Sequence, residues 1–513
     1  MYVGAIPTTG DFKILDSITT SSSTTFNLRQ GGVAVYPQSA NHCLVVLNGV
    51  LQTAGSSFNI VNDTIVFASS LASSDVINQI LVLGNVNDIG TPSDDTITAA
   101  KLNNTAISGL SALAATPDDT DELMISDAGT LKRIDYSYLK SSVVNRPNAQ
   151  ALIINGNMDV WQRGTATVTT TGDYVGVDRF KISEDTDGSF STERHTMSNA
   201  EFTTTGFGYA LQADCTGTDA SIGASQTAEI TQKIEAQNLQ LLQYGTSNAK
   251  NLTLSFWVKS SKTGTYCVAI RKRDTTSYDI PIEYSISSAD TWEKKVLNIS
   301  PTAGSTSFIT SAAGAITNDN GDGLHVTFCL AIGSNFQGTN NTWVAASKLC
   351  TSNQVNWMDS TSNDFYLTGV QLEVGEYTSA TIPPFQHETY AENLIRCMRY
   401  FQTPIFNKDT QGTNEEYAVF GTGVYSSSSY FRCPRPLPVE MRINPSLVSS
   451  SGTNYFFILA GANDDINDLA IFPDSNYKTA WVYNSDEASG TAGQAGILMG
   501  NNASAYAWLN AEL

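Results

Sequence analysis

The sequence predicts an all-β protein, with several β-sandwich or jelly-roll domains strung along an extended fibre, a short linker or neck and one short helix. Three observations predict this class. Apolar residues recur in runs of about four to eight residues between turn signals. Charged residues form only 15% of the chain, so hydroxyl and amide side chains must solvate much of the surface, as suits strands joined by turns. A length of 513 residues suffices for about three or four domains.

Residues 1–84 form the first predicted unit, a small antiparallel β-sandwich. The dipeptide Asn48-Gly49 follows an apolar run and is a strong signal for a hairpin turn. The expected strands cover residues 26–28, 43–47, 58–60, 65–67 and 77–83.

Residues 85–150 are predicted to be a linker or neck. Ile97, Leu102 and Ile107 are spaced five apart, and neither a helix nor a strand buries one face at that spacing. Two interpretations stay open: a solvated linker with a short helix near 107–115, or a thin segment in which three copies wrap together. Farther along, residues 118–134 resemble a hairpin with Asp127-Ala-Gly at its turn.

Residues 151–385 carry the strongest strand pattern and predict a two-sheet jelly roll. Residues 386–401 read as a short amphipathic helix with Tyr390, Leu394, Cys397, Met398 and Phe401 near one face. Residues 402–513 return to strand patterns and predict a second, smaller sandwich. The expected strands of the jelly roll are 251–258, 266–271, 292–299, 324–332 and 365–373.

Charge and cysteine usage exclude several classes of function. A net charge of −21 argues against binding nucleic acid or an anionic membrane through a basic face. The seven cysteines include no C-x-x-C pair, which excludes a zinc ribbon or redox motif. Cys267 and Cys329 lie in apolar runs and are predicted to be buried free thiols, which favours assembly in a reducing cytoplasm. We expect no signal peptide and no membrane insertion.

No pattern in the chain predicts catalysis or a cofactor. The acidic turn at 318–323 looks like a calcium loop, but Cys329 stands where the twelfth-position Glu belongs, so a β-turn is the better interpretation. The histidines are too dispersed for a metal pair, and no nucleophile elbow or phosphate-binding loop is present. We therefore predict a protein that is not an enzyme, with no metal site and no cofactor.

The aromatic residues are the candidate ligand contacts, because exposed rings stack on the apolar faces of sugars. Trp161, Trp257 and Trp292 lie in strand-like or strongly patterned segments and are predicted to pack in the core. Trp343 and Trp357 lie in polar loops and, with Tyr278, form the candidate ligand-contact set. Packing is the alternative for these three rings as well.

Several segments resemble known proteins. The string Ile154-Asn-Gly-Asn-Met-Asp-Val-Trp-Gln-Arg-Gly164, with the later segments 369–375, 383–394 and 396–401, resembles a module common in tail-fibre proteins of bacteriophages. The segment 435–446 resembles a stretch found at the same point in that family. Residues 47–52 and 57–67 are similar to the N-terminal domain of marine-phage fibres. Segments 254–261 and 264–271 resemble paired inner strands of carbohydrate-binding jelly rolls.

The resemblance implies a homotrimeric tail fibre that adheres to the host cell surface through a glycan or protein receptor. It implies that residues 1–84 attach to tail proteins of the virion, and we expect residues 85–150 to contribute trimer contacts. Residues 402–513 are the candidate receptor-binding tip. The implied location is the virion tail, after assembly in the bacterial cytoplasm. Two alternatives remain: a structural virion protein such as a head fibre or tail adaptor, and a tailspike depolymerase, whose usual β-helix repeat is not found.

Overall fold

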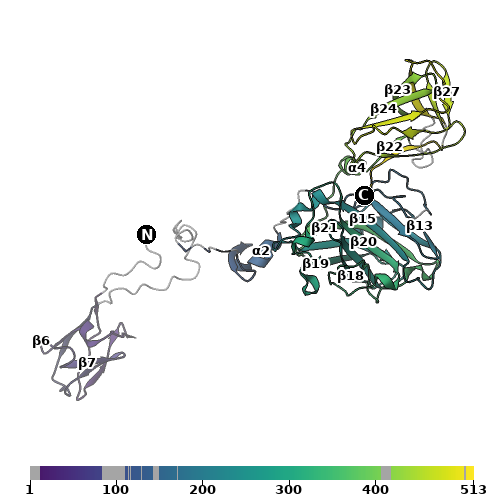
Figure 1. Ribbon diagram of the computed structural model, residues 1–513. Coiled ribbons are helices and arrows are strands. Elements are labelled where there is room, and N and C mark those ends of the chain that lie inside the picture. Colours follow the sequence, from purple (N-terminus) through teal and green to yellow (C-terminus); the bar gives the residue numbers. More distant parts are fainter. Residues whose placement is uncertain are drawn as a thin grey trace. The chain divides into compact units, whose positions relative to one another are not determined.

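The computed structural model describes residues 12–83, 110–111, 113, 115, 117–128, 130–142, 150–169, 172–405, 418–501 and 504–513. The chain divides into two compact units, residues 1–118 and 119–513. The described residues are mainly antiparallel strands (Figure 1), which confirms the all-β prediction. The expectations for Ile97, Leu102 and Ile107 lie outside the described residues, as does most of the helix expected near 107–115.

The first unit contains the predicted antiparallel sandwich. Asn48 and Gly49 both have positive φ angles, 52° and 78°, as the tight turn between β5 and β6 requires. Its core contains Leu28, Val45 and Ile65. Its sheets have the order β1 (Lys13–Ile14), β9 (Ile77–Val82), β5 (Cys43–Leu47), β6 (Val50–Leu51) and the order β2 (Thr25–Asn27), β8 (Thr64–Phe67), β7 (Phe58–Val61), beside a small pair β3 (Arg29–Gln30) and β4 (Val33–Ala34).

A hairpin opens the described part of the second unit, as predicted. Strands β10 (Glu122–Asp127) and β11 (Thr130–Asp135) pair in antiparallel register. Ala128 at the turn has a φ angle of 50°. The short helix α2 (Tyr136–Ser142) follows directly.

Two five-stranded sheets form the jelly roll, which confirms that prediction (Figure 1). The resemblance to paired inner strands is corrected: β16 and β17 do not pair but lie in opposite sheets, joined by a short connection at residues 261–263. The rings of Phe256 on β16 and Phe328 on β20 meet edge to face across that core, with centroids 5.0 Å apart. One sheet has the order β12 (Phe180–Glu184), β15 (Thr227–Glu235), β20 (Asp322–Ile332), β17 (Gly264–Lys272), β18 (Tyr278–Ile286); the other has β13 (Ser189–Thr196), β14 (Tyr209–Gly217), β21 (Asp364–Val374), β16 (Leu252–Ser260), β19 (Glu293–Ile299).

Helices are more numerous than the single one expected. The predicted helix is α4 (Tyr390–Met398), which begins with a capping box between Thr389 and Glu392. Helix α3 (Asn199–Thr205) begins with another, between Ser198 and Glu201. On α4 Cys397 is buried, but Tyr390 is exposed. Short 3-10 turns also occur: η1 (Ala40–His42), η3 (Ala236–Leu242), η4 (Ala303–Ser305), η5 (Ala312–Gly314), η6 (Ser334–Phe336) and η7 (Trp357–Asp359).

The predicted C-terminal sandwich is present. Its core contains Phe420, Phe431, Phe456 and Leu498. Its seven-stranded sheet has the order β27 (Asn463–Ile466), β26 (Phe456–Leu459), β30 (Ala495–Gly500), β23 (Val419–Ser427), β24 (Tyr430–Pro436), β29 (Thr479–Asn484), β28 (Ala470–Ile471), and its three-stranded sheet has β22 (Phe401–Ile405), β31 (Ala507–Asn510), β25 (Ser446–Ser449).

All seven cysteines are free and buried, including Cys267 and Cys329, as predicted for those two. Burial raises the pKa of the Cys43 and Cys267 thiols to about 11. It raises the pKa of Cys433 to about 12. These thiols are therefore neutral and covered by apolar side chains.

Candidate functional site

The three rings expected to contact a ligand lie in the jelly-roll core. Trp343 and Trp357 have no exposed surface and Tyr278 is 5% exposed. The indole nitrogen of Trp343 donates to the Ser300 carbonyl at 2.8 Å, and that of Trp357 donates to the Asp364 carbonyl at 3.0 Å. The three rings are therefore buried in this structure, as the packing alternative predicts, and they offer little surface to a ligand. The core prediction is confirmed for Trp161 and Trp292, while Trp257 is half-buried.

The segments that carry the tail-fibre resemblance meet in a buried junction. The Asn155 amide donates to the Val160 carbonyl, and its oxygen accepts from the Val160 N–H, both at 2.9 Å. Asn393 from α4 donates to the same Asn155 oxygen at 3.2 Å. A Cβ on Gly156 would lie 2.1 Å from the Val370 carbonyl oxygen, so only glycine fits there. The early and late segments therefore form one structural element.

Buried charges join this junction to the end of the chain. The Glu512 carboxylate accepts from Arg163 at 3.1 Å and also pairs with Arg179. The guanidinium of Arg163 lies 3.5 Å from the ring centroid of Phe401, and that of Arg179 lies 3.4 Å from the ring centroid of Tyr400. These contacts hold the C-terminal sandwich against the jelly roll. The junction therefore has an architectural role.

The junction also strongly perturbs the nearby Asp178 carboxyl. Burial raises the pKa of Asp178 to about 6, against the opposing effects of Arg163 and of hydrogen bonds from Gln162. The Gln162 backbone N–H donates to Asp178 at 2.9 Å, and its side chain donates to the Phe401 carbonyl at 3.0 Å. A perturbed carboxyl can indicate a functional site. Here its hydrogen bonds lie inside the structural junction.

An accessible aromatic surface lies on the C-terminal sandwich. Side chains alternate between the two faces of a strand. Phe431 and Cys433 on β24 and Val482 on β29 point into the core. The intervening residues point outward and are half-buried. We call this outward set the aromatic strip; it consists of Tyr430, Arg432, Phe472, Trp481 and Tyr483.

The rings of the aromatic strip are ordered by direct contacts. Tyr430 and Tyr483 are stacked, with centroids 5.3 Å apart and an interplanar angle of 8°. Phe472 meets Tyr483 edge to face at 6.0 Å. The Arg432 guanidinium lies 4.9 Å from the Tyr430 centroid and 5.2 Å from the Phe472 centroid. Such packing fixes the rings before a ligand arrives, which reduces the entropy lost on binding.

The outward face of the jelly-roll sheet β12-β15-β20-β17-β18 carries buried charged residues beside a small apolar cluster that contains Cys267 and Cys329. Asp279 accepts from the Arg271 side chain at 3.2 Å and from the Lys348 N–H at 3.1 Å. Burial raises the pKa of Asp279 to about 6 and also raises the pKa of Glu229. One carboxylate oxygen of each is buried and has no hydrogen-bond partner among the described residues. Because these oxygens are covered, they are less accessible to a ligand than the aromatic strip.

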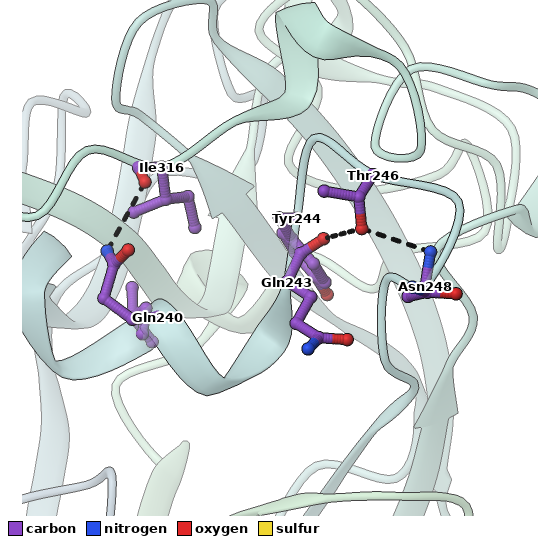
Figure 2. Close-up of a pocket in the computed structure, with 7 residues that line it drawn as sticks. Gln240, Gln243, Tyr244, Thr246, Asn248 and Ile316 are labelled. Atoms are coloured by element: carbon purple, nitrogen blue, oxygen red, sulfur yellow. Dashed lines mark hydrogen bonds between the residues drawn. The ribbon is translucent and has the colours of Figure 1, made fainter.

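A second polar feature of the jelly roll is a cavity of about 300 Å³ beside η3 (Figure 2). Gln240 donates to the Ile316 carbonyl at 3.4 Å, and the Thr246 hydroxyl donates to the Gln243 carbonyl at 2.8 Å (Figure 2). Tyr244 lines the cavity, but it is buried and its hydroxyl has no partner among the described residues. The cavity offers neutral amides and hydroxyls without an exposed ring.

Two other kinds of site were sought in the described part of the chain. There, no three His, Cys, Asp or Glu side chains gather in an arrangement that could hold a metal ion. None of the helices described there has the length and apolarity needed to cross a membrane.

Comparison with known proteins gives distant structural likenesses. No family model matches the sequence, and no curated protein matches it. A putative sugar binding protein from Bacteroides thetaiotaomicron is 15% identical, with a TM-score of 0.25, over 44% of this chain and 100% of the other. The enzymatically active domain of bacteriophage CBA120 tailspike protein 4 is 12% identical, with a TM-score of 0.21, over 44% of this chain and 21% of the other.

A third similar structure is TmCBM61, solved in complex with β-1,4-galactotriose. It is 11% identical, with a TM-score of 0.22, over 44% of this chain and 99% of that one. Identities and TM-scores this low carry no argument about what this chain binds. The candidate site therefore has to be judged from its own residues.

The sequence contains a signal for the aromatic strip in the alternation of strands β24 and β29. In Tyr430-Phe-Arg-Cys-Pro and Thr479-Ala-Trp-Val-Tyr-Asn, small or apolar residues alternate with large aromatic residues or Arg432. One set fills the core, so the other must face outward. Arg432 is the direct register partner of Tyr483, and strand pairing cannot be read from one sequence.

Proposed function

We propose that this chain is a bacteriophage tail-fibre protein, without enzymatic activity, that attaches the virion to a glycan of the host surface. The aromatic strip is the observation that carries the glycan part of this proposal. It combines stacked, half-exposed rings with a guanidinium, and these groups suit the apolar faces and the hydroxyls of a sugar. The tail-fibre part rests on the motifs that resemble such fibres and on the composition, which has few charged residues and an excess of acidic ones.

The proposed mechanism is multivalent. A homotrimer would present three copies of the strip, and weak contacts by each copy would add up through effective concentration. The N-terminal unit would attach to tail proteins, while the C-terminal sandwich would face the host. Assembly would take place in the bacterial cytoplasm, where the seven thiols stay reduced.

The test compares full-length chains on host cells and on a glycan array. Tyr430→Ala combined with Tyr483→Ala removes the stacked pair, and we expect glycan binding to fall by about tenfold or more, since stacked aromatic contacts contribute about 1 kcal/mol each. Tyr36→Ala is the control, because Tyr36 is an exposed tyrosine in the other unit. Unchanged binding by the double variant would refute the strip as the site.

A depolymerase assay on host envelope polysaccharide tests the non-enzymatic part of the proposal. We expect no release of oligosaccharides by the full chain. Release of oligosaccharides would favour a tailspike enzyme. Labelling of virions with antibody against the chain tests its location, and label on the head in place of the tail would favour a structural head protein.

A further inference from the structure

The outward face of one N-terminal sheet is aliphatic where a solvated sheet would be polar. Leu81 on β9 pairs with Ile14 on β1 and with Leu44 on β5, so these three side chains form one row across the sheet. Val46 lies in the next row, where it pairs with Leu51 on β6 and with Gln79 on β9, the polar member of that row. We call Ile14, Leu44, Val46, Leu51 and Leu81 the aliphatic face.

The burial pattern confirms that this face points away from the core. Residues of the alternate register, Cys43, Val45 and Ile80, belong to the buried core of the unit. Ile14 is 59% exposed, Leu44 is 42% exposed and Leu51 is 60% exposed. An antiparallel sheet with one free face usually places polar residues on it. A contiguous apolar patch instead marks a surface that another protein covers.

The distribution of charged residues in the N-terminal unit favours a second copy of the chain as the partner. Residues 12–83 contain only Lys13, Asp16, Arg29, Asp63 and Asp75 as charged residues. Arg29 pairs with Asp63 at 2.6 Å, and Asp16 accepts two backbone N–H groups at 2.8 Å. None of the five belongs to the aliphatic face. Copies of a chain with a net charge of −21 repel one another, so they associate most readily through a face without carboxylates.

We propose that the aliphatic face packs against the same unit of a second copy of this chain. The inference rests on the proposed multimeric fibre and specifies one surface that holds its copies together. It assigns the N-terminal sheet a role in self-association. Interfaces of permanent homo-oligomers are rich in aliphatic contacts and poor in charge at their centre, as this face is.

The test uses cross-linking of the full-length protein with a flexible bis-maleimide of about 10 Å span. Leu51→Cys places a reactive thiol on the aliphatic face. Val61→Cys is the matched control, because Val61 is 54% exposed in the other sheet of the unit. The native thiols are buried and give a low background. We expect covalent dimers in most of the Leu51→Cys protein and a yield at least tenfold lower for Val61→Cys.

Equal yields from the two variants, or cross-linking of neither, would overturn the inference. Cross-linking of Leu51→Cys to a different virion protein, with no dimer of this chain, would also overturn it. Glycan binding by the same preparations separates the two proposals. If these preparations form dimers but do not bind glycan, the result counts against the proposed function. If they bind glycan but form no dimers, the result counts against the aliphatic interface.

Discussion

The aliphatic face of the N-terminal sheet and the aromatic strip of the C-terminal sheet both turn apolar side chains to solvent, but with different chemistry. Ile14, Leu44 and Leu51 offer flexible hydrocarbon without hydrogen-bonding groups. Tyr430, Arg432 and Tyr483 offer fixed rings and polar ends. Hydrocarbon alone favours a permanent contact with another hydrocarbon surface. Rings with polar ends suit a reversible contact with a hydrated ligand. The difference teaches that exposure alone does not identify a receptor site.

The largest expected effect is on the stability of the buried junction, which supports the sandwich that carries the aromatic strip. Glu512→Ala leaves Arg163 and Arg179 buried without their carboxylate, and we expect the free energy of unfolding to fall by about 3–5 kcal/mol. Urea titration followed by tryptophan fluorescence measures it. The control Glu440→Ala removes an exposed partner of Lys478 and should cause no measurable change. A stable Glu512→Ala protein would show that the junction does not hold the sandwich.

The next effect distinguishes the aliphatic face, which should affect only multivalent adhesion, from the aromatic strip, which should affect the binding of a single glycan. Leu44→Asp combined with Leu51→Asp places carboxylates on the aliphatic face, so copies should separate, and adhesion to cells should fall by about a hundredfold or more. Affinity for a soluble, monovalent glycan should not change. Light scattering and calorimetry measure the two quantities, with Val61→Asp as control. A change in the affinity for the monovalent glycan would contradict this prediction, because it would show that the two surfaces are not independent.

A smaller effect concerns the guanidinium of the aromatic strip. Arg432→Lys keeps the charge but loses the planar group that lies beside Tyr430 and Phe472. We expect glycan affinity to fall about fivefold, which corresponds to about 1 kcal/mol for an exposed cation–π contact. Calorimetry with the glycan selected on the array measures the change. If glycan affinity is fully retained, only the rings of the aromatic strip contribute to glycan binding.

The smallest expected effect on glycan binding is that of replacing a buried ring of the jelly roll. Trp357→Phe removes one of two hydrogen bonds to the Asp364 carbonyl, which keeps its bond from Ser260, and leaves a gap where the larger ring was. We expect a stability loss of about 1–3 kcal/mol. Glycan affinity should stay the same, because the ring is not exposed. Parallel urea titration and calorimetry measure both quantities. Altered affinity at unchanged stability would return Trp357 to the candidate site.

Strand periodicity predicted the main features of the fold because burial decides which residues face the core. The five expected jelly-roll strands correspond to β16, β17, β19, β20 and β21. In the N-terminal unit, Asn48-Gly49 forms the predicted turn between β5 and β6. The assignment of strands to sheets was not predictable, because β16 and β17 are neighbours in sequence and lie in opposite sheets. The burial of the candidate ligand-contact rings could not be predicted for a related reason. A polar loop around Trp343 and Trp357 indicates a solvated segment, yet the large rings of that loop turn inward.

The burial of the seven thiols has a consequence for durability. A thiol reacts with oxidants mainly as its thiolate, and each unit by which the pKa rises lowers the thiolate fraction about tenfold at a given pH. Burial raises the pKa of Cys43, Cys267 and Cys433 to about 11, 11 and 12. We therefore expect these thiols of the folded chain to react only slowly with oxidants. Unfolding, local or global, is the event that would expose the sulfur atoms to an oxidant.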